Sequence, residues 1–390
     1  LVRWTEKRNM RAIVDLLSNK KLSVNNLISH EFKVDQFQKA YELLLGKNHY
    51  LGILIRYEDL IDNKKKTIKL DYIDSKYSRG PQKTNVNFIG AGNYCRTNLI
   101  PAFVKSGACL SIISSNTGLN PIDLARKFKF KEATTNINSC FEDQISNTIV
   151  ICTRHDSHAK YIIEALNCKK NVFVEKPICL NIDELQNIKR AYYETFKEKN
   201  RPILMVGFNR RFSPLVIKMK DQIQKLSGPK SLIYTCNAGF VESNNWIHDI
   251  RQGGGRLIGE ACHFLDLARF LIDSKIKNIN KSSLSKGSFN NDTFTLHVEF
   301  MDGSIATIHY ISIGSKSFPK ERIEVFANEC VLQLDNFRKL RSWGIKNFTN
   351  FRNIKQDKGQ NNCVKSFVKA IESGSESPIP FDELIEVQEF

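Results

Sequence analysis

The sequence has 390 residues, 41% apolar and 25% charged, which is typical of a globular protein and excludes a collagen-like, low-complexity or mostly disordered chain. Its 58 basic and 41 acidic residues leave a formal charge of +17, which fits nucleic acid, a membrane surface, an anionic small molecule or a mere compositional habit. No apolar run approaches the roughly 20 residues that span a bilayer, and ten cysteines without a CxxC pair favour free thiols in a reducing cytoplasm.

Residues 1–60 are expected to form a small unit of two helices and a strand. The first helix covers Met10 to Leu17, Asp35 is the predicted N-cap of the second, and residues 51–57 read as a strand. About sixty residues give at best a marginal core. Residues 61–84 are polar and basic and contain Gly-Pro, so we predict a linker there.

From residue 85 the pattern changes to strand, turn and helix, repeated several times. Apolar runs at 86–90, 108–114, 147–153 and 171–177 are predicted strands, and helical patterns separate them. Strands that alternate with helices indicate βαβ units. We therefore predict an α/β fold in which residues 85–208 form a Rossmann-type, doubly wound parallel sheet that binds a dinucleotide.

Residues 209–390 are predicted to form an α+β domain with a large, mostly antiparallel open sheet. Helical stretches cover about 213–226 and 257–273. Alternating strands follow at 293–300, 304–313, 322–328 and 330–335, and an Asp-Gly turn joins the first two. We expect this domain to hold the substrate and to mediate oligomerisation.

The sequence Gly90-Ala91-Gly92-Asn93-Tyr94-Cys95 carries the first functional signal. It follows a predicted strand and opens a predicted helix, as a dinucleotide-binding turn does. The first glycine permits a tight turn, and the second lets the backbone approach a pyrophosphate at the helix N-terminus. The alternative is an ordinary glycine turn.

The end of the second strand, Ser114-Ser115-Asn116-Thr117, bears on the choice of dinucleotide. An acidic residue normally binds the ribose hydroxyls of NAD there, and an arginine holds the 2′-phosphate of NADP. The sequence has neither at this point. The cofactor is therefore NAD or NADP, with Ser115 beside its ribose.

Two histidines, His155 and His158, follow the strand at 147–153. They lie at the carboxyl end of a parallel strand, where such sheets bind ligands. A metal site is one interpretation, but no third ligand lies nearby, so we predict no metal. His158 is expected to cap the next helix or to line the cofactor.

A Glu175-Lys176-Pro177 sequence ends the next strand. Pro177 stops the strand and forces a turn that directs Lys176 toward the sheet edge. A lysine beside a hydroxyl that is being oxidised stabilises the developing alkoxide charge. The alternative is a solvated surface ion pair.

Three glycines, Gly253 to Gly255, precede a helical stretch that contains His263. They give a loop whose backbone can approach a ligand. His263 lies about two turns into the helix and has the chemistry of a general acid or base near neutral pH. A helical histidine with a structural role is the alternative.

Taken together and in this order, these segments resemble the Gfo/Idh/MocA oxidoreductase family over about residues 85–390. The matching segments are residues 90–95, 153–158, 175–177, 207–214 and 253–263. The resemblance implies a Rossmann domain followed by an α/β domain, and hydride transfer between a nicotinamide and a sugar or polyol carbon. It implies a small-molecule sugar partner, a homo-oligomer and no partner of nucleic acid or membrane.

The resemblance also assigns site residues by position. Lys176 and His263 match the catalytic pair. Family members usually carry an aspartate four residues before that histidine, where this chain has Gly259. Glu260 follows, but it points about 100° away on a regular helix and is therefore not a simple substitute. The predicted cofactor-binding residues are Gly90, Gly92, Asn93, Tyr94, Ser115, Thr153, His158 and Glu175, and the predicted substrate-binding residues are Arg210, Trp246 and Glu260.

The resemblance narrows to a two-part subgroup, in which a zinc-type medium-chain alcohol dehydrogenase module precedes the Gfo/Idh/MocA module. Residues 1–60 resemble the tail of that first module, and we expect no chemistry from them. Because the sequence begins with Leu1 and stops at Phe390 in mid-pattern, we also expect a fragment truncated at both ends. The subgroup implies a nucleotide-linked sugar in surface-polysaccharide biosynthesis. A catalytically silent nucleotide-binding or regulatory protein that kept the fold is the alternative. Lys176, Arg210, Arg211 and Arg256 are the cations expected to favour anionic ligands.

Overall fold

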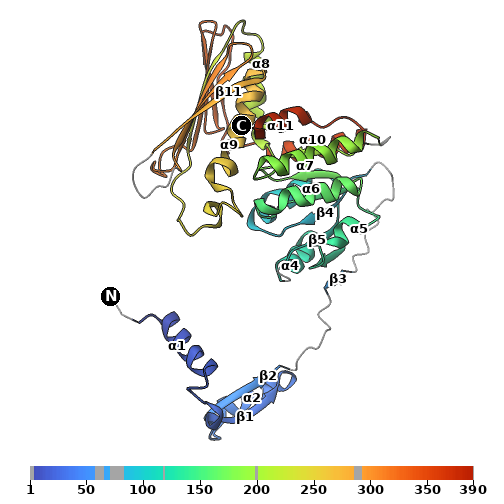
Figure 1. The fold of residues 1–390 in the computed structure, drawn as a ribbon, viewed down its shortest axis with the longest axis vertical. Helices are drawn as coiled ribbons and strands as arrows, with labels where there is room; N and C mark the ends of the chain where they lie inside the picture. Colours follow the sequence, from blue (N-terminus) through green and yellow to red (C-terminus); the bar gives the residue numbers. More distant parts are fainter. Residues whose placement is uncertain are drawn as a thin grey trace. The chain divides into compact units, whose positions relative to one another are not determined.

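The computed structural model describes residues 4–57, 66–70, 83–116, 119–197, 201–284 and 292–389. The chain divides into two compact units, residues 1–65 and 66–390, and each is described here by itself (Figure 1). Among the residues described, no helix combines the length and the apolar character needed to cross a membrane.

The first unit is small and has almost no core. Its elements are α1 (Glu6–Ser18), β1 (Ile28–Lys33), α2 (Phe37–Leu45) and β2 (Gly52–Arg56). β1 and β2 pair in parallel, and α2 connects them. Ala40 is the single apolar residue of the described part of this unit that is fully buried, which agrees with the marginal core expected for its length.

The predicted N-cap of α2 is wrong by one residue. Asp35 lies inside a 3-10 turn, Val34–Gln36, and Gln36 occupies the cap position without a side-chain hydrogen bond. The helix therefore begins through a tightened turn rather than through a carboxylate cap, a common way to start a helix.

The second unit contains a seven-stranded sheet. Its strands are β3 (Thr67–Lys69), β4 (Asn85–Ile89), β5 (Cys109–Ser114), β6 (Glu132–Thr134), β7 (Thr148–Ile151), β8 (Asn171–Val174) and β9 (Leu204–Val206). The order is β3-β6-β5-β4-β7-β8-β9, and every pair except β3–β6 is parallel. From β6 to β9 this is the doubly wound order, whose ligand crevice lies where β4 meets β7.

Helices connect these strands and follow the predicted rhythm. They are α3 (Ile100–Lys105), α4 (Leu119–Phe128), α5 (Asn138–Glu142), α6 (His158–Asn167) and α7 (Ile182–Glu194). A π-helical turn, Cys95–Leu99, leads into α3 from the glycine turn. The four central strands β4, β5, β7 and β8 have almost entirely buried side chains, because the sheet is covered on both faces.

The predicted linker at 61–84 contains a strand. β3 pairs with β6 in antiparallel register, with Thr67 opposite Thr134, and adds an edge to the nucleotide-binding sheet. The two threonine hydroxyls lie 2.8 Å apart. Three residues carry too little pattern to be recognised alone, and the strand exists because the edge of β6 offers hydrogen-bond partners. The rest of the predicted linker lies mostly outside the described residues.

The second sheet has eight strands. They are β10 (Ser231–Asn237), β11 (Ile276–Ser283), β12 (Phe294–Phe300), β13 (Ile305–Ile311), β14 (Glu321–Ala327), β15 (Cys330–Asp335), β16 (Lys339–Trp343) and β17 (Phe351–Arg352). The order is β11-β12-β13-β10-β14-β15-β16-β17, and only β10–β13 is parallel. The predicted mostly antiparallel sheet is confirmed.

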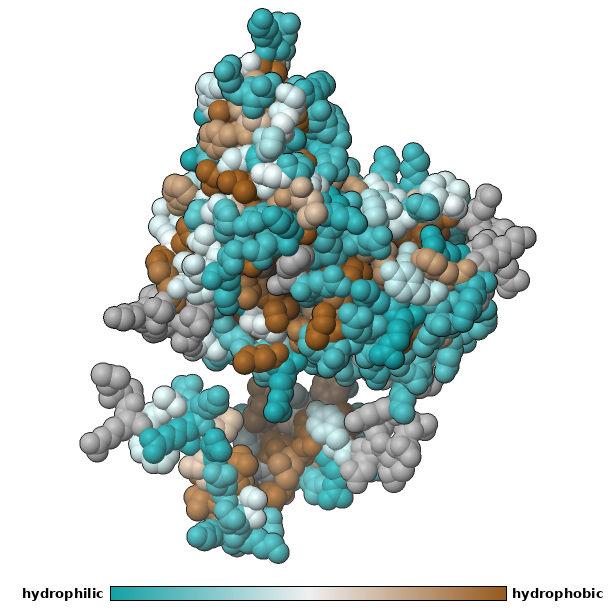
Figure 2. Space-filling model, turned by 45° about the horizontal axis from the view of Figure 1, so that its top comes forward, coloured by the Kyte–Doolittle hydropathy of each residue, from teal (hydrophilic) through white to brown (hydrophobic). Residues whose placement is uncertain are grey.

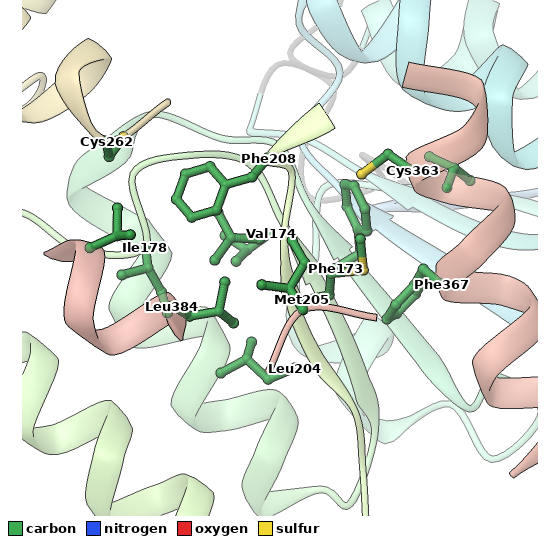
Figure 3. Packing of buried hydrophobic residues seen from close by; sticks show 14 of the residues in the cluster. Phe173, Val174, Ile178, Leu204, Met205, Phe208, Cys262, Cys363, Phe367 and Leu384 are labelled. Atoms are coloured by element: carbon green, nitrogen blue, oxygen red, sulfur yellow. The ribbon is translucent and has the colours of Figure 1, made fainter. Parts of the chain in front are cut away.

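Four helices complete the unit: α8 (Pro214–Ile223), α9 (Gly255–Ile272), α10 (Gln360–Ser373) and α11 (Phe381–Glu389). α9 packs against β10 and β13, whereas α10 contacts α3, and α11 contacts α7 and β9 (Figure 1). The end of the chain therefore returns to the nucleotide-binding sheet, and the predicted 209–390 domain is not continuous in space. Figure 3 shows Phe173 of β8 beside Phe367 of α10, and their ring centroids lie 5.4 Å apart.

Candidate active site

The glycine turn after β4 has the geometry that a bound dinucleotide requires. Gly90 has a φ of +109°, and a Cβ there would lie 2.6 Å from the carbonyl oxygen of Cys152. Nothing lies within 4 Å of the Cβ position of Gly92, so this side of the turn is open. Cys95 is buried, and its Sγ lies 3.5 Å from the Gly90 carbonyl oxygen. Close packing on one side and open backbone on the other fit a pyrophosphate at the helix start.

Ser115 lies just beyond β5, at the edge where a ribose would sit. Its backbone N–H donates to the Thr134 carbonyl over 3.2 Å, which fixes the chain as it leaves the strand. No charged residue occurs in the sequence from Ser114 to Pro121. The strand end therefore offers hydroxyl and amide groups to a ribose.

The structure contradicts the predicted contact between His158 and the cofactor. The ring is fully buried, with Nδ1 2.7 Å from the Pro177 carbonyl oxygen and Nε2 3.3 Å from that of Thr153. Burial lowers the pKa of His158, and the one N–H of the neutral ring is assigned by the shorter contact to Nδ1, which donates to the Pro177 carbonyl. Thr153 itself is half-buried, and its hydroxyl lies 2.6 Å from that of Ser157.

Glu175 is a buried carboxylate at the end of β8. Its Oε1 has no hydrogen-bond partner, and a Cβ at Gly207 would lie 2.7 Å from that atom. Burial raises the pKa of Glu175 to about 7, and Lys176 acts in the opposite direction. A buried acceptor without a partner calls for a donor, and a ligand donor at this strand end is one that fits a cofactor.

Lys176 is held by two groups of α9. Its Nζ lies 2.7 Å from the Gly259 carbonyl oxygen and 2.7 Å from Oε1 of Glu260. The expectation that Glu260 points away is wrong, because two long side chains bridge the angle between their backbones. The surface ion-pair alternative fails as well, since Lys176 is only 15% exposed and Glu260 25%.

His263 lies one turn further along α9. It is 6% exposed, its Nδ1 has no hydrogen-bond partner, and its ring lies edge-on to Phe208 with centroids 5.9 Å apart. Burial lowers its pKa well below the usual value, and the charges of Arg210 and Lys176 act in the same direction. The imidazole is therefore neutral at physiological pH, and the lowered pKa makes it a weaker proton acceptor than a free imidazole.

Arg210 does not present its charge to a ligand as predicted. Its Nε and Nη2 donate to the two carboxylate oxygens of Glu321 over 2.8 and 3.1 Å. Lys358 donates to the same carboxylate over 2.6 Å, and the hydroxyl of Tyr234 is also hydrogen-bonded to it. These contacts hold the pKa of Glu321 far below its usual value against the effect of burial. Arg210 is thus bound to Glu321 inside the fold.

Two other cations expected to favour anionic ligands are also paired inside the fold. Arg211 donates to Asp266 and Glu383, and Arg256 donates to the Tyr310 hydroxyl over 2.9 Å and to the Gly239 carbonyl over 2.8 Å. Hydrophilic side chains cover much of the face of the molecule seen in Figure 2. Only Lys176 lies with the residues that we expect to take part in the reaction; Arg210, Arg211 and Arg256 do not.

Trp246 lies in a short turn, Trp246–His248, against the loop before α9. Its ring lies edge-on to His155 with centroids 4.9 Å apart, and Nδ1 of His155 lies 2.8 Å from the Gly253 carbonyl oxygen. The sequence treats His155 only as a metal candidate. Among the described residues, no group of three histidine, cysteine or acidic side chains is placed to hold a metal. His155 instead contacts Trp246 and Gly253, which lie about a hundred positions away in the sequence, so no local sequence pattern indicates these contacts.

These groups together can bind a hydroxyl, hold charge on its oxygen and take up its proton. Lys176 is a fixed ammonium, Glu260 its carboxylate partner and His263 a neutral base. Gly90, Gly92 and Glu175 lie at the neighbouring strand ends and fit a dinucleotide. Sequence reasoning found each of these residues but not the contacts that join Lys176 to α9.

Comparison with known families matches two parts of the chain. Residues 84–208 match the model of an oxidoreductase family with an NAD-binding Rossmann fold. Residues 231–332 match the GFO/IDH/MocA C-terminal domain. The second match starts at β10 and ends within β15, so the two models cover both sheets of the larger unit.

Relatives and solved structures agree with these matches. The chain is 26% identical over 232 residues to Oxidoreductase P35 of Formosa agariphila, covering 57% of this chain and 70% of the relative. It is 25% identical to myo-inositol 2-dehydrogenase of Thermotoga maritima, covering 56% of this chain and 65% of that one, slightly under two thirds. The structure of levoglucosan dehydrogenase with NADH and levoglucosan superimposes with a TM-score of 0.68 and 20% identity, covering 79% of this chain and 95% of that one.

Proposed function

Because the chain belongs to the Gfo/Idh/MocA family of NAD-binding oxidoreductases, we propose that it transfers hydride to or from a hydroxyl-bearing carbon of a sugar or polyol. The observation that carries this proposal is the Lys176–Glu260 pair beside His263. Names of relatives, including myo-inositol 2-dehydrogenase and levoglucosan dehydrogenase, support a polyol or sugar substrate.

The proposed mechanism assigns one task to each residue. When a nicotinamide is bound, it supplies the hydride acceptor or donor. Gly90, Gly92 and the helix start at Asn93 hold its pyrophosphate, and Ser115 binds its ribose. Lys176 donates a hydrogen bond to the substrate oxygen and stabilises negative charge on it. His263 removes the hydroxyl proton during oxidation and returns it during reduction.

We further propose that the substrate is a nucleotide-linked sugar used in surface-polysaccharide biosynthesis. Lys320 supports an anionic substrate, because its charge acts on His263 and, unlike Lys176, Lys358 and Arg210, it forms no ion pair with a carboxylate among the described residues. Lys320 is exposed, and Asn237 of β10 donates to its backbone carbonyl over 2.7 Å. Trp246 offers an aromatic surface for stacking against a base or sugar.

Residues 1–60 are proposed to be the tail of a medium-chain dehydrogenase module and to supply no site residue. The parallel β1–α2–β2 unit supports this, because parallel strands joined by a helix are the building unit of nucleotide-binding sheets. We also propose a cytoplasmic homo-oligomer.

Cofactor titration followed by a substrate panel tests the main proposal. Fluorescence titration with NADH and NADPH should show binding, and one member of a panel of inositols, sugars and sugar nucleotides should change the cofactor absorbance. Absence of binding at about 1 mM of either cofactor, a barely measurable affinity, would sink the proposal.

A further inference from the structure

Position 259, one helical turn before His263, has little space for a side chain. A Cβ on Gly259 would lie 3.0 Å from Cε1 and 3.5 Å from Nδ1 of His155. Carbon atoms pack at about 3.5–4.0 Å, so the first of these distances requires a shift of the imidazole ring. The carbonyl oxygen of Gly253, the hydrogen-bond partner of His155, lies 3.6 Å from the same point, at an ordinary contact distance.

His155 is not free to make that shift. It is 6% exposed, and its Nδ1 is hydrogen-bonded to the Gly253 carbonyl over 2.8 Å. Trp246 lies edge-on against the ring, and the centroid of the His158 ring is 5.7 Å away. The His155 ring is therefore fixed between the end of β7, the glycine loop and the turn at Trp246–His248.

The backbone carbonyl of Gly259 accepts a hydrogen bond from Lys176. One N–H of the ammonium donates to that carbonyl over 2.7 Å, and a second donates to Glu260 Oε1 over 2.7 Å. An ammonium has three donors, so one is left for a substrate oxygen. Glu260 thus sets the direction of the third N–H as well as balancing the charge.

We propose that Glu260 is the positioning residue for Lys176. Glu260 has this role, rather than residue 259, because His155 fills the space that a side chain at position 259 would need. The carboxylate beside the reacting lysine is thereby displaced from the position that the family resemblance implies to the next residue of α9. This inference rests on the proposed hydride transfer, and it concerns which residue orients the lysine.

A set of variants tests both halves of the inference through kcat, KM and cofactor Kd. Glu260→Ala should lower kcat about 100-fold, the size of the loss when a reacting group is misplaced, and leave cofactor Kd within about twofold. Adding Gly259→Asp to Glu260→Ala should not restore turnover, because His155 blocks the new side chain. Adding His155→Ala as a third change should restore kcat by about tenfold over the double variant. Glu194→Ala, whose side chain is 68% exposed on α7, is the matched control and should behave as the unchanged protein.

Three results contradict the inference. If Glu260→Ala keeps its kcat, Glu260 does not position Lys176. If the Glu260→Ala, Gly259→Asp double variant recovers as much turnover as the triple variant, His155 does not exclude a side chain at position 259. If the triple variant recovers no turnover, opening that space does not allow a carboxylate at 259 to replace Glu260.

A second measurement is independent of activity. Urea unfolding of Lys176→Met, Glu260→Gln and the variant with both changes should give a non-additive cycle, because each single change leaves a buried group without its partner. Additive effects would contradict the pairing. If the protein binds no cofactor but the cycle is non-additive, the proposed function fails while the pairing of Lys176 with Glu260 stands.

Discussion

At the scale of single residues, burial rather than charge controls the histidines of the site. His155, His158 and His263 are all buried, and burial is the first cause that lowers the pKa of each. A neutral His155 donates to a backbone carbonyl, whereas a neutral His263 has an unpaired Nδ1. The same physical effect therefore keeps both rings neutral, and they differ in whether Nδ1 has a hydrogen-bond partner.

The lowered pKa of His155, about 4 against an unfolded value of about 6.5, predicts how stability depends on pH. Between these values the unfolded chain takes up a proton that the folded chain refuses. The stability linked to His155 is therefore complete above about pH 6.5 and falls by about 3 kcal/mol as pH drops toward 4.

Urea unfolding at several pH values between 7 and 4 checks this prediction, with His155→Gln as the comparison. Glutamine retains a donor for the Gly253 carbonyl but does not titrate. The pH dependence of the variant should be weaker by about one proton across this window. Equal pH dependence in both proteins would show that His155 takes up its proton in the folded state at the usual pH.

At the scale of elements, the glycine turn between β4 and the helix start is the segment at which we propose that the cofactor binds. Gly90→Ala would force a Cβ to within 2.6 Å of the Cys152 backbone oxygen at a φ of +109°. We expect cofactor Kd to rise at least about tenfold, with a loss of stability of about 1–3 kcal/mol.

Gly107→Ala provides the matched control for that substitution. Gly107 also has a positive φ, +84°, but nothing lies within 4 Å of its Cβ position. It should lose about 1 kcal/mol of stability and keep its cofactor Kd. Fluorescence titration and thermal melting of both variants separate strain from contact, and equal cofactor affinities would refute the assigned role of Gly90.

Helices and strands were predicted well from the sequence where several consecutive residues follow one hydrophobic pattern. They were predicted poorly where contacts with distant parts of the chain determine the structure. The repeated strand–helix rhythm predicted β4, β5, β7 and β8, because buried parallel strands are continuous apolar runs. β3 was missed because its formation depends on the free edge of β6. The angular argument about Glu260 failed because it considered only the helix backbone and not the reach of two long side chains.

At the scale of the whole molecule, all proposed site residues lie in the unit of residues 66–390. A shortened chain that begins at residue 66 keeps β3, both sheets and the returning helices α10 and α11. We expect its cofactor Kd and kcat to stay within about threefold of those of the full chain, because compact units fold by themselves.

Titration and steady-state kinetics of the shortened chain beside the full chain check this expectation. A large loss of cofactor binding would place part of the nucleotide site in the first unit. A loss of kcat with unchanged cofactor Kd would instead give that unit a part in substrate binding.

The proposed mechanism depends most on Lys176, because that residue follows a strand of the nucleotide-binding sheet, contacts α9 and is proposed to bind the substrate oxygen. Lys176→Met keeps a side chain of similar length and removes the charge. The direct measurement is the single-turnover rate of hydride transfer at saturating cofactor, followed by nicotinamide absorbance. We predict a fall of about 100- to 1000-fold with cofactor Kd unchanged. A rate equal to that of the unchanged protein would contradict the account.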